Sequence, residues 1–368
     1  MASNSQNILP KDLAIDILTL LPVKSLMRFK CVSKSWCATI RSSDFISQHF
    51  KKKNSCHLLV HYYVSPYADD LVELFLDETL EDLSHQHFGL PIPFSKLHGP
   101  CNGIFCVSDG SSYALWNPAT KELQHLPATL AKPSLPVPLT SGGDICGFGL
   151  DPITNNFKVL VIQGFLSEYH FFAQVMLHTF GTNVWRELEI GQDYSLPHGT
   201  LSQDYVVTSS SCYTFLNGVH YWLASHNFDN RILSFHMSND EFQEIQVPYY
   251  SLYATHETLV IYHDSIALLL YEMTNNILDI WVMMEDGSWI KQITVGPLPE
   301  LLYPIGYWKN DQLILESDTG QLKLCTPNTQ EVKELRLKGS PLYYGVFIVK
   351  ESLVSLNHRD EQPQYVED

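Results

Sequence analysis

The sequence predicts two unlike parts, a small helical module at the N-terminus and a large all-β domain behind it. Apolar residues between Leu9 and Ile40 recur at helical spacing, whereas from Leu58 onward short runs of Val, Ile, Tyr, Phe and Trp alternate with tight turns. A chain of 368 residues, 45% of them apolar, is long enough for one small and one large core. We therefore expect an α+β multidomain protein with a three-helix module followed by a β-rich domain.

The first expected helix carries an apolar stripe at positions i, i+4, i+7 and i+8, formed by Leu13, Ile17, Leu20 and Leu21. Pro10 is tolerated in its first turn because the missing N–H has no intrahelical partner there, and Pro22 ends the helix. Such a short module buries little surface alone, so its stripe is expected to be completed by a partner.

Two further helices follow, one from near Val23 and a third that Ser33 is placed to cap. Asp44 is placed to cap a last short helix that runs through Phe50. The expected domain boundaries are 1–50 for the helical module, 51–95 for an acidic connection that begins the β domain, 96–356 for the β domain and 357–368 for a polar, disordered tail.

Tight hairpins are predicted throughout the β domain. Asn102-Gly103, Asn217-Gly218 and Asp286-Gly287 favour two-residue turns with positive φ, and Asp318-Thr319-Gly320 is a weaker fourth signal. A loose repeat of strand, polar turn and strand starts at Leu115, His178, Ser234, Trp281 and Leu324. The spacing is near that of propeller blades, and the length suits about six of them. A large two-sheet sandwich remains the alternative.

Charge is distributed unevenly along the chain. Residues 1–53 hold nine Lys/Arg against three acids, which leaves 14 bases and 37 acids for residues 54–368. This large acidic excess favours cationic partners and argues against nucleic acid, although acids also keep a β domain soluble. The eight cysteines lack paired spacing, and no signal peptide or membrane-length apolar run is present, so we expect a cytoplasmic or nuclear protein.

The stretch ILPKDLAIDILTLLPVKSLMRFKCVSKSWCATI, within residues 8–50, closely resembles the F-box family. It combines Leu-Pro-x-x-Leu, Leu-Pro-x-x-Ser-Leu and a Val-Ser-Lys-x-Trp ending. The resemblance implies binding to a Skp-type adaptor, which bridges to a cullin and a RING subunit. Carried over position by position, it implies an adaptor-facing set of Leu9, Pro10, Leu13, Ile17, Leu20, Leu26, Val32 and Trp36.

The remainder resembles the F-box-associated domain of plants, and in particular the S-locus F-box and S-locus F-box-like group. The motifs are CNGIFCV from Cys101, LWNPATKEL from Leu115, GFGLDPITNNFKVL from Gly147, DIWVMMEDGSWIKQITV from Asp279 and IGYWKNDQLIL from Ile305. The resemblance implies a kelch-like propeller that receives a protein target. In the S-locus group this target is a basic secreted S-ribonuclease of the pistil, and the F-box protein is made in pollen.

Seven acids with no base between them form a candidate surface for steering a basic target, namely Asp69, Asp70, Glu73, Asp77, Glu78, Glu81 and Asp82. A solvated loop or edge strand is the alternative interpretation of this run. Gly147-x-Gly149 has Pro152 where a dinucleotide fingerprint needs its third glycine, so we interpret it as a strand-edge turn.

The resemblance implies a substrate-recognition subunit of an SCF-type ubiquitin ligase that presents a target protein for ubiquitination and degradation. No catalytic, metal or cofactor motif is recognisable, so we expect this subunit to be non-catalytic and without a cofactor. Two rivals remain open. One is a propeller enzyme, and the other is an F-box interaction protein that acts outside a ligase.

Overall fold

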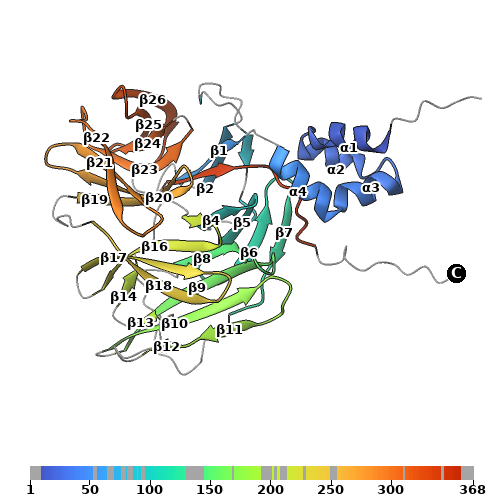
Figure 1. The fold of residues 1–368 in the computed structure, drawn as a ribbon, viewed down its shortest axis with the longest axis horizontal. Helices are drawn as coiled ribbons and strands as arrows, with labels where there is room; N and C mark the ends of the chain where they lie inside the picture. Colours follow the sequence, from blue (N-terminus) through green and yellow to red (C-terminus); the bar gives the residue numbers. More distant parts are fainter. Residues whose placement is uncertain are drawn as a thin grey trace, which may run out of the picture.

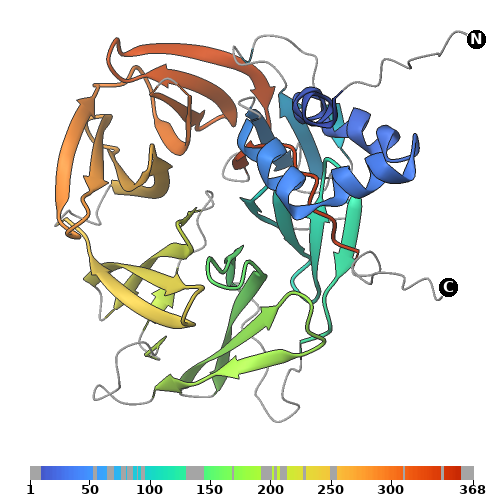
Figure 2. The same ribbon diagram turned by 45° about the vertical axis from the view of Figure 1, so that its right-hand side comes forward.

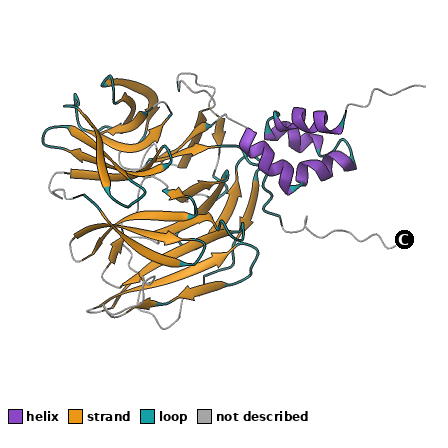
Figure 3. Cartoon of the chain, in the orientation of Figure 1, coloured by secondary structure: helices purple, strands orange, loops and turns teal. Residues whose placement is uncertain are grey.

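The structure is a computed structural model. It describes residues 10–52, 56–63, 70–75, 80, 86–88, 90–92, 96–129, 145–167, 170–191, 201–202, 205–207, 214–226, 229–248, 255–309, 311–340 and 344–357. The helices gather at one end of the molecule, and strands make up its body (Figure 3). Within the described residues, every helix precedes the first strand in sequence. The predicted fold class, a small helical module before a large β domain, is confirmed.

The helical module contains four helices, which are the three expected of the module and the last short helix that was predicted to run through Phe50. Its helices are α1 (Lys11–Thr19), α2 (Val23–Phe29), α3 (Lys34–Arg41) and α4 (Ser43–Lys52). Ser33 caps α3 as predicted, because its hydroxyl accepts a hydrogen bond from the Trp36 amide at 3.1 Å. The predicted cap of α4 was wrong, since Ser42 rather than Asp44 accepts the hydrogen bond from the Phe45 amide at 3.3 Å.

The β domain is a ring of six blades (Figure 2). Blade 1 has the strand order β27-β1-β2-β3, with β27 (Gly345–Val349), β1 (His57–Tyr63), β2 (Asp70–Phe75) and β3 (Gln86–Phe88). Blade 2 comprises β4 (Lys96–Cys101), β5 (Ile104–Ser108), β6 (Tyr113–Asn117) and β7 (Glu122–His125). Blade 3 comprises β8 (Ile145–Leu150), β9 (Phe157–Ser167), β10 (His170–Thr179) and β11 (Trp185–Leu188).

Blade 4 contains β14 (Tyr205–Val207), β15 (Phe215–Leu216), β16 (Val219–His226), β17 (Asp229–His236) and β18 (Glu241–Gln246). Blade 5 contains β19 (Thr255–Tyr262), β20 (Ser265–Glu272), β21 (Ile277–Met283) and β22 (Trp289–Val295). Blade 6 contains β23 (Leu302–Trp308), β24 (Gln312–Ser317), β25 (Gln321–Thr326) and β26 (Glu331–Lys338). The short strands β12 (Ile190–Gly191) and β13 (Leu201–Ser202) pair in parallel beside blade 3.

Strands near the centre contact one another in the closed order β27, β4, β8, β16, β19, β23 and back to β27. The ring is closed by antiparallel pairing of β27 with β1, in which Leu58 faces Ile348 and Val60 faces Val346. The described strands therefore form separate sheets arranged around a ring, which excludes the two-sheet sandwich and leaves only the short outer edge of each blade unpaired.

The predicted repeat corresponds to the same part of five of the six blades. Its five segments are the outer hairpins β6–β7, β10–β11, β17–β18, β21–β22 and β25–β26 of blades 2 to 6. The predicted turns also form hairpins, and Asn102, Gly103, Asn217 and Gly218 all have positive φ. The expected turn at Gly147-x-Gly149 was wrong, because both glycines lie inside β8.

The helical module sits beside blades 1 and 2 (Figures 1 and 2). α4 ends at Lys52 and β1 begins at His57, so residues 53–56 join the two parts. After β27, residues 350–357 continue from the ring and pass between the helices and blade 2 (Figure 1). The expected tail lies almost entirely outside the described residues.

Candidate functional site

The first candidate surface is the outward face of α1. Leu13, Ile17 and Leu20 point away from the module's core with exposed fractions of 48%, 47% and 75%. Their spacing puts them on one face of the helix. Leu18, 4% exposed, belongs to the opposite face and packs in the core. The helix is therefore apolar on two sides, and among the described residues only the side with Leu18 is packed in a core.

The inward side of α1 packs in a core that the helical module forms without the exposed side chains of the outward face. Leu18, Val23, Leu26, Ile40 and Phe45 form a buried cluster together with Leu353 from the C-terminal end. His49, fully buried in α4, has its Nε2 2.9 Å from the Leu21 carbonyl oxygen. Lys52 makes an exposed ion pair with Asp16 at 2.7 Å, which joins α4 to α1.

The other residues of the expected adaptor-facing set lie in different environments. Val32, in the turn between α2 and α3, is 62% exposed, and Pro10 is also exposed at the start of α1. Trp36 is half-buried, with its ring centroid 5.5 Å from that of Phe29. Leu26 is completely buried in the module's own core, so we leave it out of the candidate surface. Leu9 lies outside the described residues.

Of the seven acids in the expected steering surface, the structure describes the side chain of Glu73 alone. Glu73 is 5% exposed and accepts a hydrogen bond from the Tyr62 hydroxyl at 2.8 Å. Burial and this carboxylate raise the pKa of Tyr62 well above its ordinary value. Glu73 was thus wrongly assigned to a steering surface, because its place in β2 points it into blade 1. The side chain of Asp70 and the residues Asp69, Asp77, Glu78, Glu81 and Asp82 lie outside the described residues.

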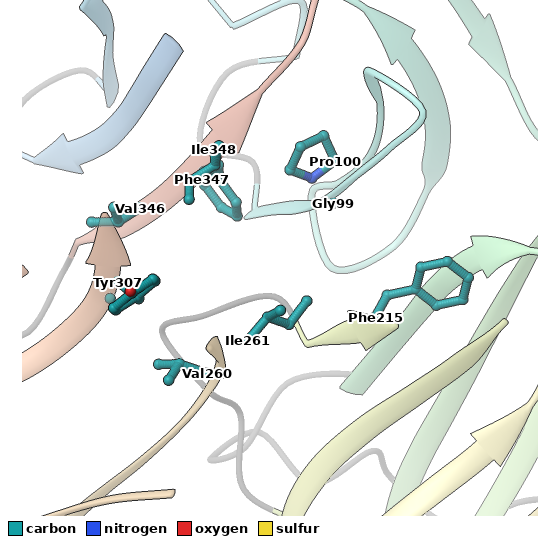
Figure 4. A pocket seen from close by; sticks show the side chains of 10 residues that line it. Gly99, Pro100, Phe215, Val260, Ile261, Tyr307, Val346, Phe347 and Ile348 are labelled. Atoms are coloured by element: carbon teal, nitrogen blue, oxygen red, sulfur yellow. The ribbon is translucent and has the colours of Figure 1, made fainter. Parts of the chain in front are cut away.

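A second candidate site, which the sequence did not reveal, is a cavity of about 130 Å³ near the ring axis (Figure 4). Strands β4, β15, β19, β23 and β27 contribute its lining, with Phe215, Ile261, Val346 and Phe347 among the apolar side chains. The Tyr307 hydroxyl at its edge donates to Asp311 at 2.5 Å, and Nε2 of His263 lies 2.9 Å from the same carboxylate. Residues from five blades meet here, which a one-dimensional pattern does not show.

Several of the described cysteines are buried in the interior, where their thiols are poor nucleophiles. Cys101 and Cys106 are buried, and the Sγ atoms of Cys106 and Cys146 lie 4.0 Å apart as free thiols. Burial raises the pKa of Cys101 to about 12, so its thiol is protonated at neutral pH. Among the described residues, no group of three or more His, Cys, Asp or Glu side chains is arranged to hold a metal ion. In the same part of the chain, no helix is long and apolar enough to cross a membrane.

Comparison with known families decides what these two parts are. Residues 7–48 match the F-box domain, and residues 49–316 match the F-box associated beta propeller domain. The chain belongs to the F-box proteins with an F-box associated propeller. The boundary between the two matches falls within α4, close to where the helices give way to the ring.

Relatives of this F-box protein match over most of its length. An F-box/kelch-repeat protein of Arabidopsis thaliana is 28% identical, covering 84% of this chain and 85% of the relative. A second Arabidopsis thaliana F-box protein is 26% identical over 92% of this chain and 90% of its own. Among solved structures, TolB from Acinetobacter baumannii covers 81% of this chain and 69% of its own with a TM-score of 0.43 at 9% identity.

Proposed function

We propose that this F-box protein is the substrate-recognition subunit of an SCF-type ubiquitin ligase. In this proposal the outward face of α1 binds a Skp-type adaptor and, through it, the cullin and RING subunits. The proposal is carried by the exposure of Leu13, Ile17 and Leu20 on a module whose own core is already filled. Pro10, Val32 and Trp36 extend the proposed contact.

The size of this face fits a shared interface. Complete burial of a large aliphatic side chain contributes about 1.5–3 kcal/mol. Leu13 and Ile17 are only about half exposed, so the three side chains supply less than about 9 kcal/mol, against association costs of about 4–15 kcal/mol. The adaptor must therefore contact more of the module than α1 alone.

The propeller is the proposed receptor for the target. The chain itself would be non-catalytic, since it acts by holding a target lysine near a thioester carried by another subunit. We place this activity in the cytoplasm or nucleus, which suits the free thiols of the described cysteines.

We further propose that the target is a basic protein, of which an S-ribonuclease recognised in pollen is the specific candidate. The large negative charge of residues 54–368 supports a basic target, and the S-locus resemblance supports the ribonuclease. The second candidate function is an F-box interaction protein outside a ligase, which the F-box match alone also allows.

The proposal is tested with the substitution Leu20→Asp, and with Val184→Asp as the matched control. Val184 is an exposed aliphatic residue of similar kind, 66% exposed in the turn before β11. We expect Leu20→Asp to weaken adaptor binding at least about 30-fold, equivalent to about 2 kcal/mol, and the control to leave it unchanged. Titration calorimetry with purified adaptor measures both. Equal affinities would remove the proposal, and adaptor binding without cullin co-purification would favour the second candidate function.

A further inference from the structure

The chain contains a segment that belongs to neither part alone. Residues 350–357, which we call the C-terminal strap, follow β27 and pass between the helical module and blade 2 (Figures 1 and 2). The F-box module lies at the opposite end of the sequence, so the strap gives it a second, noncovalent attachment to the ring. The first attachment is the covalent link through residues 53–56.

The first half of the strap contacts the helices. Glu351 accepts a hydrogen bond from the Val23 amide at 3.3 Å, at the first residue of α2. The Lys350 ammonium donates to the Phe50 carbonyl oxygen at 3.3 Å and lies 5.4 Å from the centroid of the Phe50 ring. Leu353, 2% exposed, completes the buried cluster of the module.

The same segment is held just as firmly on the propeller side. The Asn117 side-chain amide donates to the Ser352 and Val354 carbonyl oxygens at 3.1 and 2.8 Å. Glu122 accepts from the Leu356 amide at 2.9 Å, and the Leu356 side chain is fully buried in the core shared by blades 2 and 3. These contacts fix the backbone of the strap on blade 2.

A glycine of blade 2 allows the close approach. A Cβ atom on Gly103 would lie 2.5 Å from the Lys350 carbonyl oxygen and 2.7 Å from Cβ of Ser352. The φ of this glycine is also +77°, a region that other residues rarely adopt. The β4–β5 turn is therefore shaped both for its own hairpin and for the strap that crosses it.

We infer that the strap sets the orientation of the F-box module relative to the propeller, with Glu351 and Leu353 as positioning residues. Leu353 and Leu356 lie three residues apart and are buried in different cores, so the strap couples the two domains mechanically. This inference rests on the proposed function for its consequence. Transfer by proximity requires a fixed distance between the adaptor-bound end and the target-bound end, and a pivoting module would lose it.

The orientation is measured directly by the distance between two spin labels, one on Ser47→Cys in α4 and one on Asn183→Cys in the turn before β11. Both positions are exposed. Only the two introduced cysteines should react with the spin label. For this reason Ser replaces Cys31, Cys37, Cys56 and Cys212. We expect one narrow distance distribution for the otherwise unchanged full chain.

Leu353→Ala and Glu351→Ala should each broaden this distribution at least twofold, whereas Leu268→Ala should keep its width while lowering the melting temperature. Leu268→Ala is the matched control because it removes the same kind of buried side chain from β20, in a propeller core that contains no residue of the strap. Glu351→Ala decides the matter if Leu353→Ala also melts the helices. Distributions as narrow as that of the parent chain in both variants would overturn the inference.

Adaptor affinity, measured on the same variants, separates this inference from the proposed function. It should be unchanged, because the strap contacts the inner side of the module and not Leu13, Ile17 or Leu20. A parent chain that fails to bind the adaptor would refute the proposed function, while the distance result would still decide the role of the strap.

Discussion

At the scale of single residues, two glycines set how closely blades 3 and 4 approach each other. Cβ atoms on Gly147 and Gly149 would overlap the Trp222 and Phe215 rings of blade 4. The pattern Gly-x-Gly gave no hint of this, because the residues that fill the space lie more than sixty positions later. A glycine in a strand commonly marks such a close approach, and this was the signal available in the sequence.

Replacing Gly147 by Ala should destabilise the propeller by about 1–3 kcal/mol, since the new methyl group would lie 2.5 Å from the Trp222 ring. Gly306→Ala is the control, because its Cβ would make only an ordinary contact of 3.4 Å with Val346. Denaturant unfolding of the two variants measures the difference. If Gly147→Ala loses no more stability than the control, the Trp222 side chain can move aside at no cost.

His220 gives the interior a dependence on pH. Its side chain is 4% exposed, and burial, together with nearby His98, lowers its pKa to about 3. A histidine in the unfolded chain binds a proton below about pH 6.5. His220 in the folded chain binds one only at a much lower pH. The stability linked to this group is therefore complete above about pH 6.5 and is lost as the pH falls towards about 3.

Between about pH 7 and about pH 5, this one group should lower the free energy of unfolding by on the order of 2 kcal/mol. His220→Gln does not titrate, so its free energy of unfolding should fall by that much less over the same interval. His125→Gln removes an exposed histidine and should keep the pH dependence of the parent chain. Parallel pH profiles for His220→Gln and the parent would contradict this assignment.

At the scale of elements, local pattern predicted the hairpins and not their closure into a ring. The five outer hairpins repeat a strand, a polar turn and a strand, each within 19 residues or fewer of sequence. β1 and β27 pair although nearly three hundred residues separate them, and no local signal marks that pairing. Glu73 was misplaced for a related reason, since Tyr62, which donates a hydrogen bond to it, comes from the preceding strand rather than from the acidic run.

The closing strand β27 allows a test of which of its side chains are buried and which are exposed. Phe347, 5% exposed, packs edge-on against Phe105 with ring centroids 5.4 Å apart, whereas the next residue, Ile348, is 41% exposed. Phe347→Ala should cost about 3–5 kcal/mol of stability, and Ile348→Ala less than about 1 kcal/mol. Urea unfolding of the two variants measures this contrast. Similar losses would mean that the pairing register of β27 with β1 is wrong.

At the scale of the whole molecule, the division into a basic helical part and an acidic β part was readable from composition. The outward face of α1 was predictable as well, because Leu13, Ile17 and Leu20 follow helical spacing next to the Leu-Pro motifs. Leu26 has the same apolar character but lies inside, which only the packing of four helices against Leu353 determines. The strap and the axial cavity arise from residues far apart in sequence, so neither was accessible to pattern alone.

The charge of the propeller gives the last prediction. With 37 acids against 14 bases in residues 54–368, its field should accelerate encounter with a basic protein, and salt should screen this effect. We expect the association rate with a basic S-ribonuclease to fall about tenfold or more between roughly 50 mM and 500 mM salt. An acidic ribonuclease is the control, and its slower association should rise or stay constant as salt increases. Stopped-flow measurements with the full chain give these association rates. If the rate for the basic ribonuclease does not change with salt, the acidic excess has no role beyond solubility.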